Sequence, residues 1–334
     1  MTITDELYEI SAKKAKSVVW VLSDLQQSVY DNMKRCLDLC MEDYESLGKP
    51  AEAIWYLGDA VEGTDPDNIS RMVNDQEKAF SALNVPLTYV CGNHDYDFCA
   101  KAIREGRKER LYIPFYDMVK THKDWHAAKS PSDPYFTQDF KAFKLFCFQD
   151  HIAEDLSWLS THNMIRSGRE VYPYKKEYFE NIRKEMKECG KPVITIGHTS
   201  FPGGNRDFES EITSQILPLP MNVRLHLYGH SHIGEYTWPR EKAFSQIGWV
   251  NWQDIPQIDV ASFENIRGCY CHSVILHIYE DNSFGIFFRN HDKHRFESSY
   301  FPAFEKCEKE NGYEEHVPRI LEMIESFKKT GRKI

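Results

Sequence analysis

The chain has 334 residues and a net charge of −10, with 41% hydrophobic and 28% charged residues. This composition is typical of a globular protein with a sizeable core and argues against a disordered chain. The acidic balance argues against nucleic acid as a generic partner, because a surplus of lysine and arginine is missing.

The sequence also bears on the compartment. The segment before residue 18 lacks the apolar region of a signal peptide. No apolar run approaches the about 20 residues that a membrane span needs. Nine irregularly spaced cysteines fit reduced core thiols better than a disulfide framework. We therefore expect a cytoplasmic protein without a membrane partner, and the sequence leaves its oligomeric state open.

The N-terminal part of the chain alternates short apolar runs with helical patterns. The runs at 18–22, 53–57 and 87–91 are bounded by polar residues and predict buried strands. Between them, residues 29–47 and 64–83 place apolar side chains at helical spacing. The order strand, helix, strand, helix, strand predicts βαβ units and a parallel sheet.

The chain beyond residue 95 is less regular. Residues 96–134 form a long excursion, which we expect to be partly helical and to lie over the rim formed by the strand ends. The later predicted elements are a hairpin at 135–149, a helix opened by Pro173, strands at 193–196 and 223–228, an antiparallel meander at 235–291, and a helix in a C-terminal extension at 301–334. We expect one domain over residues 1–300, followed by that extension.

Five predicted strands each end in a polar motif. The motifs are Ser23-Asp24-Leu25-Gln26, Gly58-Asp59, Gly92-Asn93-His94-Asp95, Gly197-His198 and Gly229-His230-Ser231-His232. Ligands bind outside the carboxyl ends of strands in open α/β sheets, so these residues are expected on one rim. Each motif alone is typical of a turn or a cap. Together, their carboxylate, amide and imidazole groups indicate a site for manganese, iron, nickel or zinc.

This ordered series resembles the calcineurin-like metallophosphoesterase superfamily, whose pattern is D-x-H, G-D, G-N-H-D/E, G-H and G-H-x-H. The resemblance spans residues 17–290. It implies an α/β fold, a four-layer α/β/β/α sandwich of two mixed sheets with metal ions at their common edge. It also implies hydrolysis of a small phosphorylated substrate, with a phosphodiester favoured, by a metal-activated water at a dinuclear centre.

The resemblance implies a role for each matching position. Asp24 and His232 would hold the first metal, Asp59 would bridge both metals, and Asn93, His198 and His230 would complete the second site. His94 would act as the general acid, with Asp95 or Glu62 orienting its ring. Two divalent ions are expected, with manganese favoured over iron, zinc, nickel and magnesium.

Gln26 departs from the family pattern, because histidine is usual at this position. The amide oxygen of Gln26 would either ligate the first metal and favour manganese or magnesium, or only hold a water beside a loosely occupied site. The presence of every other ligand favours retained activity. The alternative is a degenerate metal-binding scaffold with a regulatory or partner-binding role.

Substrate contacts are less defined by the sequence. Ala60-Val61-Glu62 occupies the stretch where purple acid phosphatases carry an iron-binding tyrosine, and Gly63 stands where Ser/Thr protein phosphatases carry arginine. The glycine-rich loop after His198 contains Asn205 and Arg206, and Arg206 is a candidate to fork onto a phosphate. The sequence does not separate a nucleotide from a phosphosugar or a lipid phosphodiester.

Overall fold

The computed structural model describes most of the chain with gaps. The described residues are 3–48, 51–98, 101, 105, 112–130, 133, 135–149, 176–199, 219–230, 232, 250–252, 255–265 and 270–300. Three sequence predictions lie outside these residues. They are the C-terminal helix within 301–334, the candidate substrate contacts Asn205 and Arg206, and the start of the helix expected at Pro173. No helix within the described ranges is long and apolar enough to cross a bilayer.

The first sheet has seven strands in the order β13-β12-β11-β1-β2-β3-β4. Its parallel part consists of β1 (Ser17–Leu22), β2 (Ala53–Tyr56), β3 (Leu87–Tyr89) and β4 (Trp125–His126). Its antiparallel part consists of β11 (His272–Ile278), β12 (Phe284–Asn290) and β13 (Arg295–Tyr300). The two parts join where β11 pairs with β1 in antiparallel fashion.

The second sheet has six strands in the order β5-β6-β7-β8-β10-β9. They are β5 (Tyr135–Asp139), β6 (Lys144–Phe148), β7 (Val193–Ile196), β8 (Val223–Tyr228), β10 (Ile255–Asp259) and β9 (Val250–Trp252). The pair β5–β6 is the expected hairpin. The prediction of an antiparallel meander over 235–291 is wrong at β10, which pairs in parallel with β8. Between β10 and β11 the chain therefore passes from one sheet to the other.

The two sheets pack face to face around an apolar core. Alternate residues of β1 divide between two sides: Val19 and Val21 join the inter-sheet core, whereas Trp20 and Leu22 face the helices. The same alternation in β6 places Leu145 in the inter-sheet core. This period of two, with both faces apolar, is what a strand buried on both sides requires.

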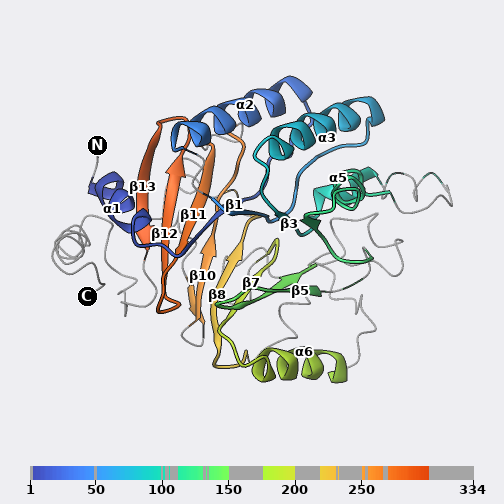
Figure 1. The fold of residues 1–334 in the computed structure, drawn as a ribbon. Helices are drawn as coiled ribbons and strands as arrows, with labels where there is room; N and C mark the ends of the chain where they lie inside the picture. Colours follow the sequence, from blue (N-terminus) through green and yellow to red (C-terminus); the bar gives the residue numbers. More distant parts are fainter. Residues whose placement is uncertain are drawn as a thin grey trace.

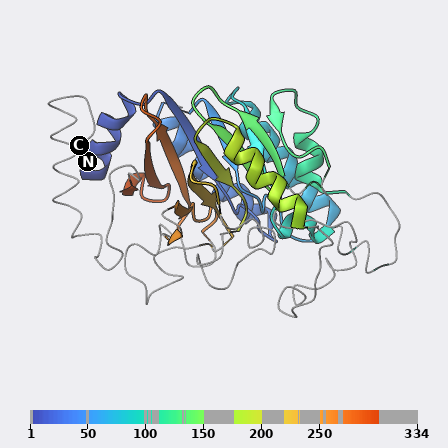
Figure 2. The ribbon, with the colours of Figure 1, turned by 90° about the horizontal axis from the view of Figure 1, so that it is seen from below.

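Helices cover the outer face of each sheet (Figures 1 and 2). On the first sheet lie α1 (Ile3–Ala12), α2 (Tyr30–Ser46), α3 (Pro66–Ser81) and α5 (Pro114–Val119). On the second sheet lies α6 (Lys176–Glu188), whose Phe179, Ile182 and Met186 pack against strands β6, β7 and β8. The result is a helix–sheet–sheet–helix sandwich, which confirms the four-layer prediction.

The stretch 96–134 is described in part. The 3₁₀ turn η1 (His94–Tyr96) leads into it, and its residues 112–130 contribute helix α5 and the edge strand β4. Phe115 of α5 packs against Tyr56 and Tyr89 of the first sheet. These residues extend the sheet and its helical layer. The expected position of the remaining stretch over the rim stays a prediction.

A buried ionic network attaches α2 to the antiparallel strands. Asp43 of α2 accepts two hydrogen bonds from the guanidinium of Arg289, at 2.8 and 2.7 Å. The Nδ1 atoms of His291 and His294 each lie 2.8 Å from its carboxylate oxygens. Burial alone would raise the pKa of Asp43, but Arg289 and the two imidazoles outweigh it and hold the pKa well below its ordinary range.

Candidate metal centre

The polar motifs that follow five strands lie together at one edge of the sandwich. Asp24, Asp59 and Asn93 follow β1, β2 and β3 of the first sheet, and the candidate histidines follow β7 and β8 of the second. The amide of Asp24 donates to Gly58 O at 3.0 Å, which joins the first two strand ends. The amide of His230 donates to Asp24 Oδ2 at 2.8 Å, which joins the two sheets.

Two glycines permit this close approach. Gly58 has φ +96°, and a Cβ there would lie 2.5 Å from the backbone nitrogen of Gly92 and 2.8 Å from His198 Nδ1. A Cβ on Gly229 would collide with the side chains of Ser23 and Asp24. Only a residue without a side chain lets these strand ends meet.

Four candidate ligands adopt a left-handed backbone conformation. Asp24, Asp59, His230 and His232 have φ of 59°, 53°, 69° and 49°. Such angles are uncommon outside glycine and cost on the order of 1–3 kcal/mol each, so they persist only where the surroundings enforce them. Their presence at four of the predicted ligands marks the strand ends as strained positions, which typically cluster at functional sites.

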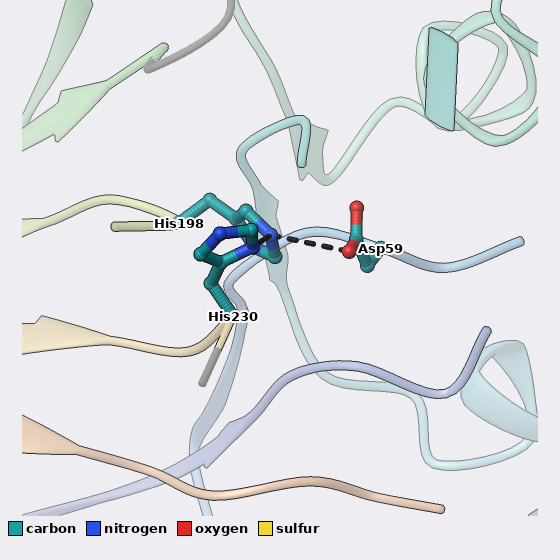
Figure 3. Close-up of side chains that lie close together, drawn as sticks. All are labelled: Asp59, His198 and His230. Atoms are coloured by element: carbon teal, nitrogen blue, oxygen red, sulfur yellow. Dashed lines mark hydrogen bonds and ion pairs between the residues drawn. The ribbon is translucent and has the colours of Figure 1, made fainter. Parts of the chain in front are cut away.

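One group of side chains converges on the Nε2 atom of His198. Asp59 Oδ2 lies 3.2 Å from it, Asn93 Oδ1 3.2 Å, and His230 Nδ1 3.1 Å. Figure 3 shows Asp59, His198 and His230 pointing toward one another from three strand ends. Ligand atoms of these three residues all lie within 4.8 Å of one another. A carboxylate, an amide oxygen and two imidazoles at this separation can enclose a divalent cation.

A second group surrounds the Nε2 atom of His232. Asp24 Oδ1 lies 3.3 Å from this nitrogen, and Gln26 Nε2 lies 2.7 Å from it. Asp24 and Gln26 are completely buried, and His232 is 5% exposed. The structure thus brings the residue that departs from the family pattern into the same cluster as its expected neighbours.

Three buried oxygen atoms in these groups test whether metal ions fit. Among the described residues, none makes a hydrogen bond of regular geometry to Asp24 Oδ1, Gln26 Oε1 or Asp59 Oδ2. The two carboxylate oxygens face the imidazole nitrogens of His232 and His198, at 3.3 and 3.2 Å. Buried polar atoms are nearly always hydrogen-bonded, because an unsatisfied one costs about 1–3 kcal/mol. Oxygen atoms of this kind, beside imidazole nitrogens, are suitable donors for a divalent cation. The residues present therefore fit a metal centre.

The charge environment of Asp59 also suits a ligand. Burial alone would raise its pKa, but the nearby imidazoles of His198, His94 and His230 outweigh burial and hold the pKa far below its ordinary range. Asp59 is therefore a carboxylate at neutral pH, as a metal ligand must be.

His94 lies at the margin of this cluster and is held by Asp97. The backbone amide of His94 donates to Asp59 Oδ1 at 2.8 Å. Its ring Nδ1 lies 3.1 Å from Asp97 Oδ2. Burial alone would lower the pKa of His94, but the carboxylates of Asp59 and Asp97 raise it to about 9. In this environment the imidazole carries a proton that it can donate.

Asp95, expected as a partner of His94, is engaged with the backbone. Its carboxylate accepts from the amides of Asp59 at 2.8 Å, Ala60 at 3.0 Å and Gly92 at 2.7 Å. These bonds tie the turn after β2 to the turn after β3. The carboxylate beside the His94 ring nitrogen Nδ1 belongs instead to Asp97, which the sequence interpretation missed. A carboxylate three residues after a histidine is a spacing that would have indicated it.

Glu264 is a second residue that the sequence interpretation missed. Its Oε1 lies 3.1 Å from Nδ1 of His232, and its side chain is completely buried. It lies five residues beyond the end of β10, in irregular backbone, so no motif or periodicity indicated it. Asn205 and Arg206, the expected substrate contacts, lie outside the described residues.

Comparisons with known proteins bear on the family and the fold of the chain. A model of the calcineurin-like phosphoesterase family matches residues 17–234, which is more than half of the chain. A dimetal phosphatase from Danio rerio has a similar structure, with a TM-score of 0.53 and 12% identity, covering 86% of this chain and 98% of its own. A purple acid phosphatase from yellow lupin (Lupinus luteus) matches with a TM-score of 0.47 and 14% identity, covering 85% of this chain and 53% of its own. No curated protein sequence matches significantly.

Proposed function

Since the chain belongs to the calcineurin-like phosphoesterase family and is therefore a metal-dependent phosphoesterase, we propose that it prefers phosphodiesters and holds two divalent metal ions at the strand ends. The observation that carries the metal assignment is the set of buried oxygen atoms of Asp24, Gln26 and Asp59 without hydrogen-bond donors among the described residues. The Danio rerio protein of similar fold is itself described as a dimetal phosphatase.

The ligands divide into two sets that share one carboxylate. Asp24, Gln26 and His232 would hold the first ion, and Asn93, His198 and His230 the second, with Asp59 between them. The mixture of carboxylate and amide oxygens with imidazole nitrogens favours manganese among the candidate metals. Gln26 belongs to the first set because its Oε1 is buried and accepts no hydrogen bond from a described residue.

Bound divalent ions supply a Lewis acid for the phosphoryl oxygens and lower the pKa of water. His94 contributes the proton that the leaving oxygen needs. Its Nδ1 is engaged by Asp97, so the proton for transfer is carried on Nε2. Asp97 also accepts the amide of Gly63 at 3.2 Å, which fixes the carboxylate, and through it the ring of His94, relative to the turn after β2.

The preference for a diester follows from the charge that the chain presents. A phosphodiester carries one negative charge, whereas a monoester carries nearly two at neutral pH. The basic groups with the largest effect on Asp59 are imidazoles, and Gly63 occupies the position where protein phosphatases carry arginine. Among the described residues, the groups that act most strongly on Asp59 are thus imidazoles, and no guanidinium is among them, which supports the less charged ester.

The test is hydrolysis of bis-p-nitrophenyl phosphate and p-nitrophenyl phosphate by metal-stripped protein. Mn²⁺, Mg²⁺, Ni²⁺ and Zn²⁺ are added back separately, and Asp59→Asn serves as the variant with a disabled shared ligand. We expect Mn²⁺ to restore the highest rate, the diester to be cleaved faster than the monoester, and Asp59→Asn to lose at least about 100-fold in kcat.

Two outcomes would contradict the proposal in different ways. Faster cleavage of the monoester would overturn the diester preference alone. If folded protein that binds a single ion hydrolyses neither ester with any metal, the result would instead support the degenerate scaffold. The loss of activity would then be assigned to Gln26.

A further inference from the structure

The His232 ring is held on both sides by side chains. On one side, Nδ1 lies 3.1 Å from Glu264 Oε1. On the other side, Nε2 lies 2.7 Å from the Gln26 amide nitrogen and 3.3 Å from Asp24 Oδ1. Glu264 is completely buried, and a carboxylate is rarely placed in the interior without a specific partner. The pair therefore has the arrangement of a carboxylate that orients a histidine.

The segment that carries Glu264 is fixed to the segment that carries the first ligands. The amide of Phe263 donates to Ser23 O at 2.8 Å, and the hydroxyl of Ser262 donates to Asp24 O at 3.0 Å. The amide of Glu264 in turn donates to Ser262 Oγ at 3.1 Å. The side-chain amide of Gln27 donates a hydrogen bond to the second carboxylate oxygen of Glu264, Oε2. The carboxylate is thus anchored to residues 23–27 through both backbone and side chain.

These contacts favour the His232 tautomer with its proton on Nδ1, because Glu264 Oε1 lies 3.1 Å from Nδ1 and the Gln26 side-chain nitrogen 2.7 Å from Nε2. A carboxylate only accepts hydrogen bonds, so Nδ1 must be the protonated nitrogen that donates to Glu264. Nε2 then presents a lone pair, which accepts from the Gln26 amide in the arrangement described. The same lone pair is the one that a metal ion requires. Glu264 therefore aims the ligand atom of His232 at the Asp24–Gln26 cluster.

We propose that Glu264 is a positioning residue for the first metal site, where it orients His232 and offsets the weaker ligand that Gln26 provides. This inference rests on the proposed function, because it assumes that His232 binds a metal ion. At position 26, an amide oxygen stands where the family usually has an imidazole nitrogen, and the amide oxygen is the weaker ligand. Binding of the first metal ion therefore depends more on His232. A carboxylate behind an imidazole makes its free nitrogen a stronger ligand.

The test compares Glu264→Gln with Glu297→Gln in full-length, metal-stripped protein. Glu297 of β13 forms a similar pair with His272 of β11, at 3.0 Å and largely buried, and neither residue is a candidate metal ligand. Binding of Mn²⁺ is followed by isothermal titration and by counting bound ions after equilibrium dialysis. We expect the weaker of two Mn²⁺ sites to lose about 10–100-fold in affinity in Glu264→Gln. The tighter site, and both sites in Glu297→Gln, are expected to keep their affinity.

Unchanged Mn²⁺ affinities in folded Glu264→Gln would overturn the proposal and leave the proposed function intact. Failure of the wild-type chain to bind any Mn²⁺ would overturn the proposed function itself, and this proposal with it. If Glu264→Gln does not fold, the tautomer decides the question. In metal-free wild-type protein labelled with ¹⁵N-histidine, we expect long-range ¹H–¹⁵N spectra to show His232 protonated on Nδ1, and protonation on Nε2 would overturn the proposal.

Discussion

At the scale of single residues, His94 and Asp97 form a hydrogen-bonded pair in the site, and neither residue is a candidate metal ligand. Replacing Asp97 with asparagine keeps the size of the side chain and removes the carboxylate that contacts the His94 ring, one of the two, with Asp59, that raise the pKa of His94. We expect kcat to fall at least about 10-fold for phenyl esters, whose leaving group needs a proton, and much less for p-nitrophenyl esters. Steady-state kinetics on both ester types checks this.

A matched control for Asp97→Asn is Asp38→Asn on α2, which removes a carboxylate from an exposed pair with Lys34. It is expected to leave both rates unchanged. An equal loss on phenyl and p-nitrophenyl esters in Asp97→Asn would show that Asp97 maintains the local structure and has no part in proton donation.

Gln26 offers a second test at this scale. Replacing Gln26 with histidine supplies an imidazole nitrogen as a ligand. It also removes the side-chain amide that donates a hydrogen bond to Nε2 of His232, the nitrogen that would bind the metal. We expect the weaker Mn²⁺ site to bind about 10-fold more tightly, measured by equilibrium dialysis. Unchanged affinity would place the side chain of residue 26 outside the coordination sphere.

The sequence predicted the ligand candidates because each directly follows a buried strand in a short motif. Asp97 and Glu264 were missed for different reasons. Asp97 stands three residues after His94, a spacing that indicates a contact, but the sequence interpretation considered only Asp95 and Glu62 as partners of the ring. The position of Glu264 beside His232 depends on the parallel pairing of β10 with β8. The antiparallel interpretation of this region gave no reason to expect it there.

At the scale of elements, helix α2 is attached to strand β12 and the turn after it by Asp43. The variant Asp43→Asn leaves the buried guanidinium of Arg289 without its carboxylate partner. We expect the free energy of unfolding to fall by about 3–5 kcal/mol at pH 7, measured by urea denaturation. A loss below about 1 kcal/mol would show that the network is energetically neutral.

The same network predicts that the free energy of unfolding depends on pH. Because the folded-state pKa of Asp43 lies below its ordinary value of 3.8, its ionised form contributes stability at higher pH, and this is lost as the pH falls through the folded pKa. Arg289, His291 and His294 are the groups that face it. The stability difference between wild type and Asp43→Asn should therefore shrink as the pH falls below about 4. A difference that grows below pH 4 would contradict this assignment.

The βαβ units of the first sheet were predictable because apolar runs and helical spacing are local signals. The pairing of β1 with β11 was not, since both strands are apolar and no local pattern encodes which strands become neighbours. The direction of β10 was missed for a related reason. A five-residue strand has the same alternation whether its neighbour runs parallel or antiparallel.

At the scale of the whole molecule, the candidate ligands come from both sheets, four from the first and three from the second. Metal ions bound between them would connect the two layers. We expect Mn²⁺ at 100 times its dissociation constant to stabilise the folded chain by about 2.7 kcal/mol for one site. Thermal unfolding with and without chelator measures this, and Asp59→Asn should reduce the shift. An identical melting temperature in both conditions would argue against binding between the sheets.

The pairing of β1 with β11 has a consequence for biosynthesis. Ser17 lies opposite Ile278 and Val21 opposite Val274, so one edge of β1 stays open until almost the whole described chain has left the ribosome. Until then the apolar residues Val18–Val21 form an unpaired strand edge, the kind of surface on which chains aggregate. Nascent chains that stop before residue 272 should therefore depend on chaperones far more than the finished protein does.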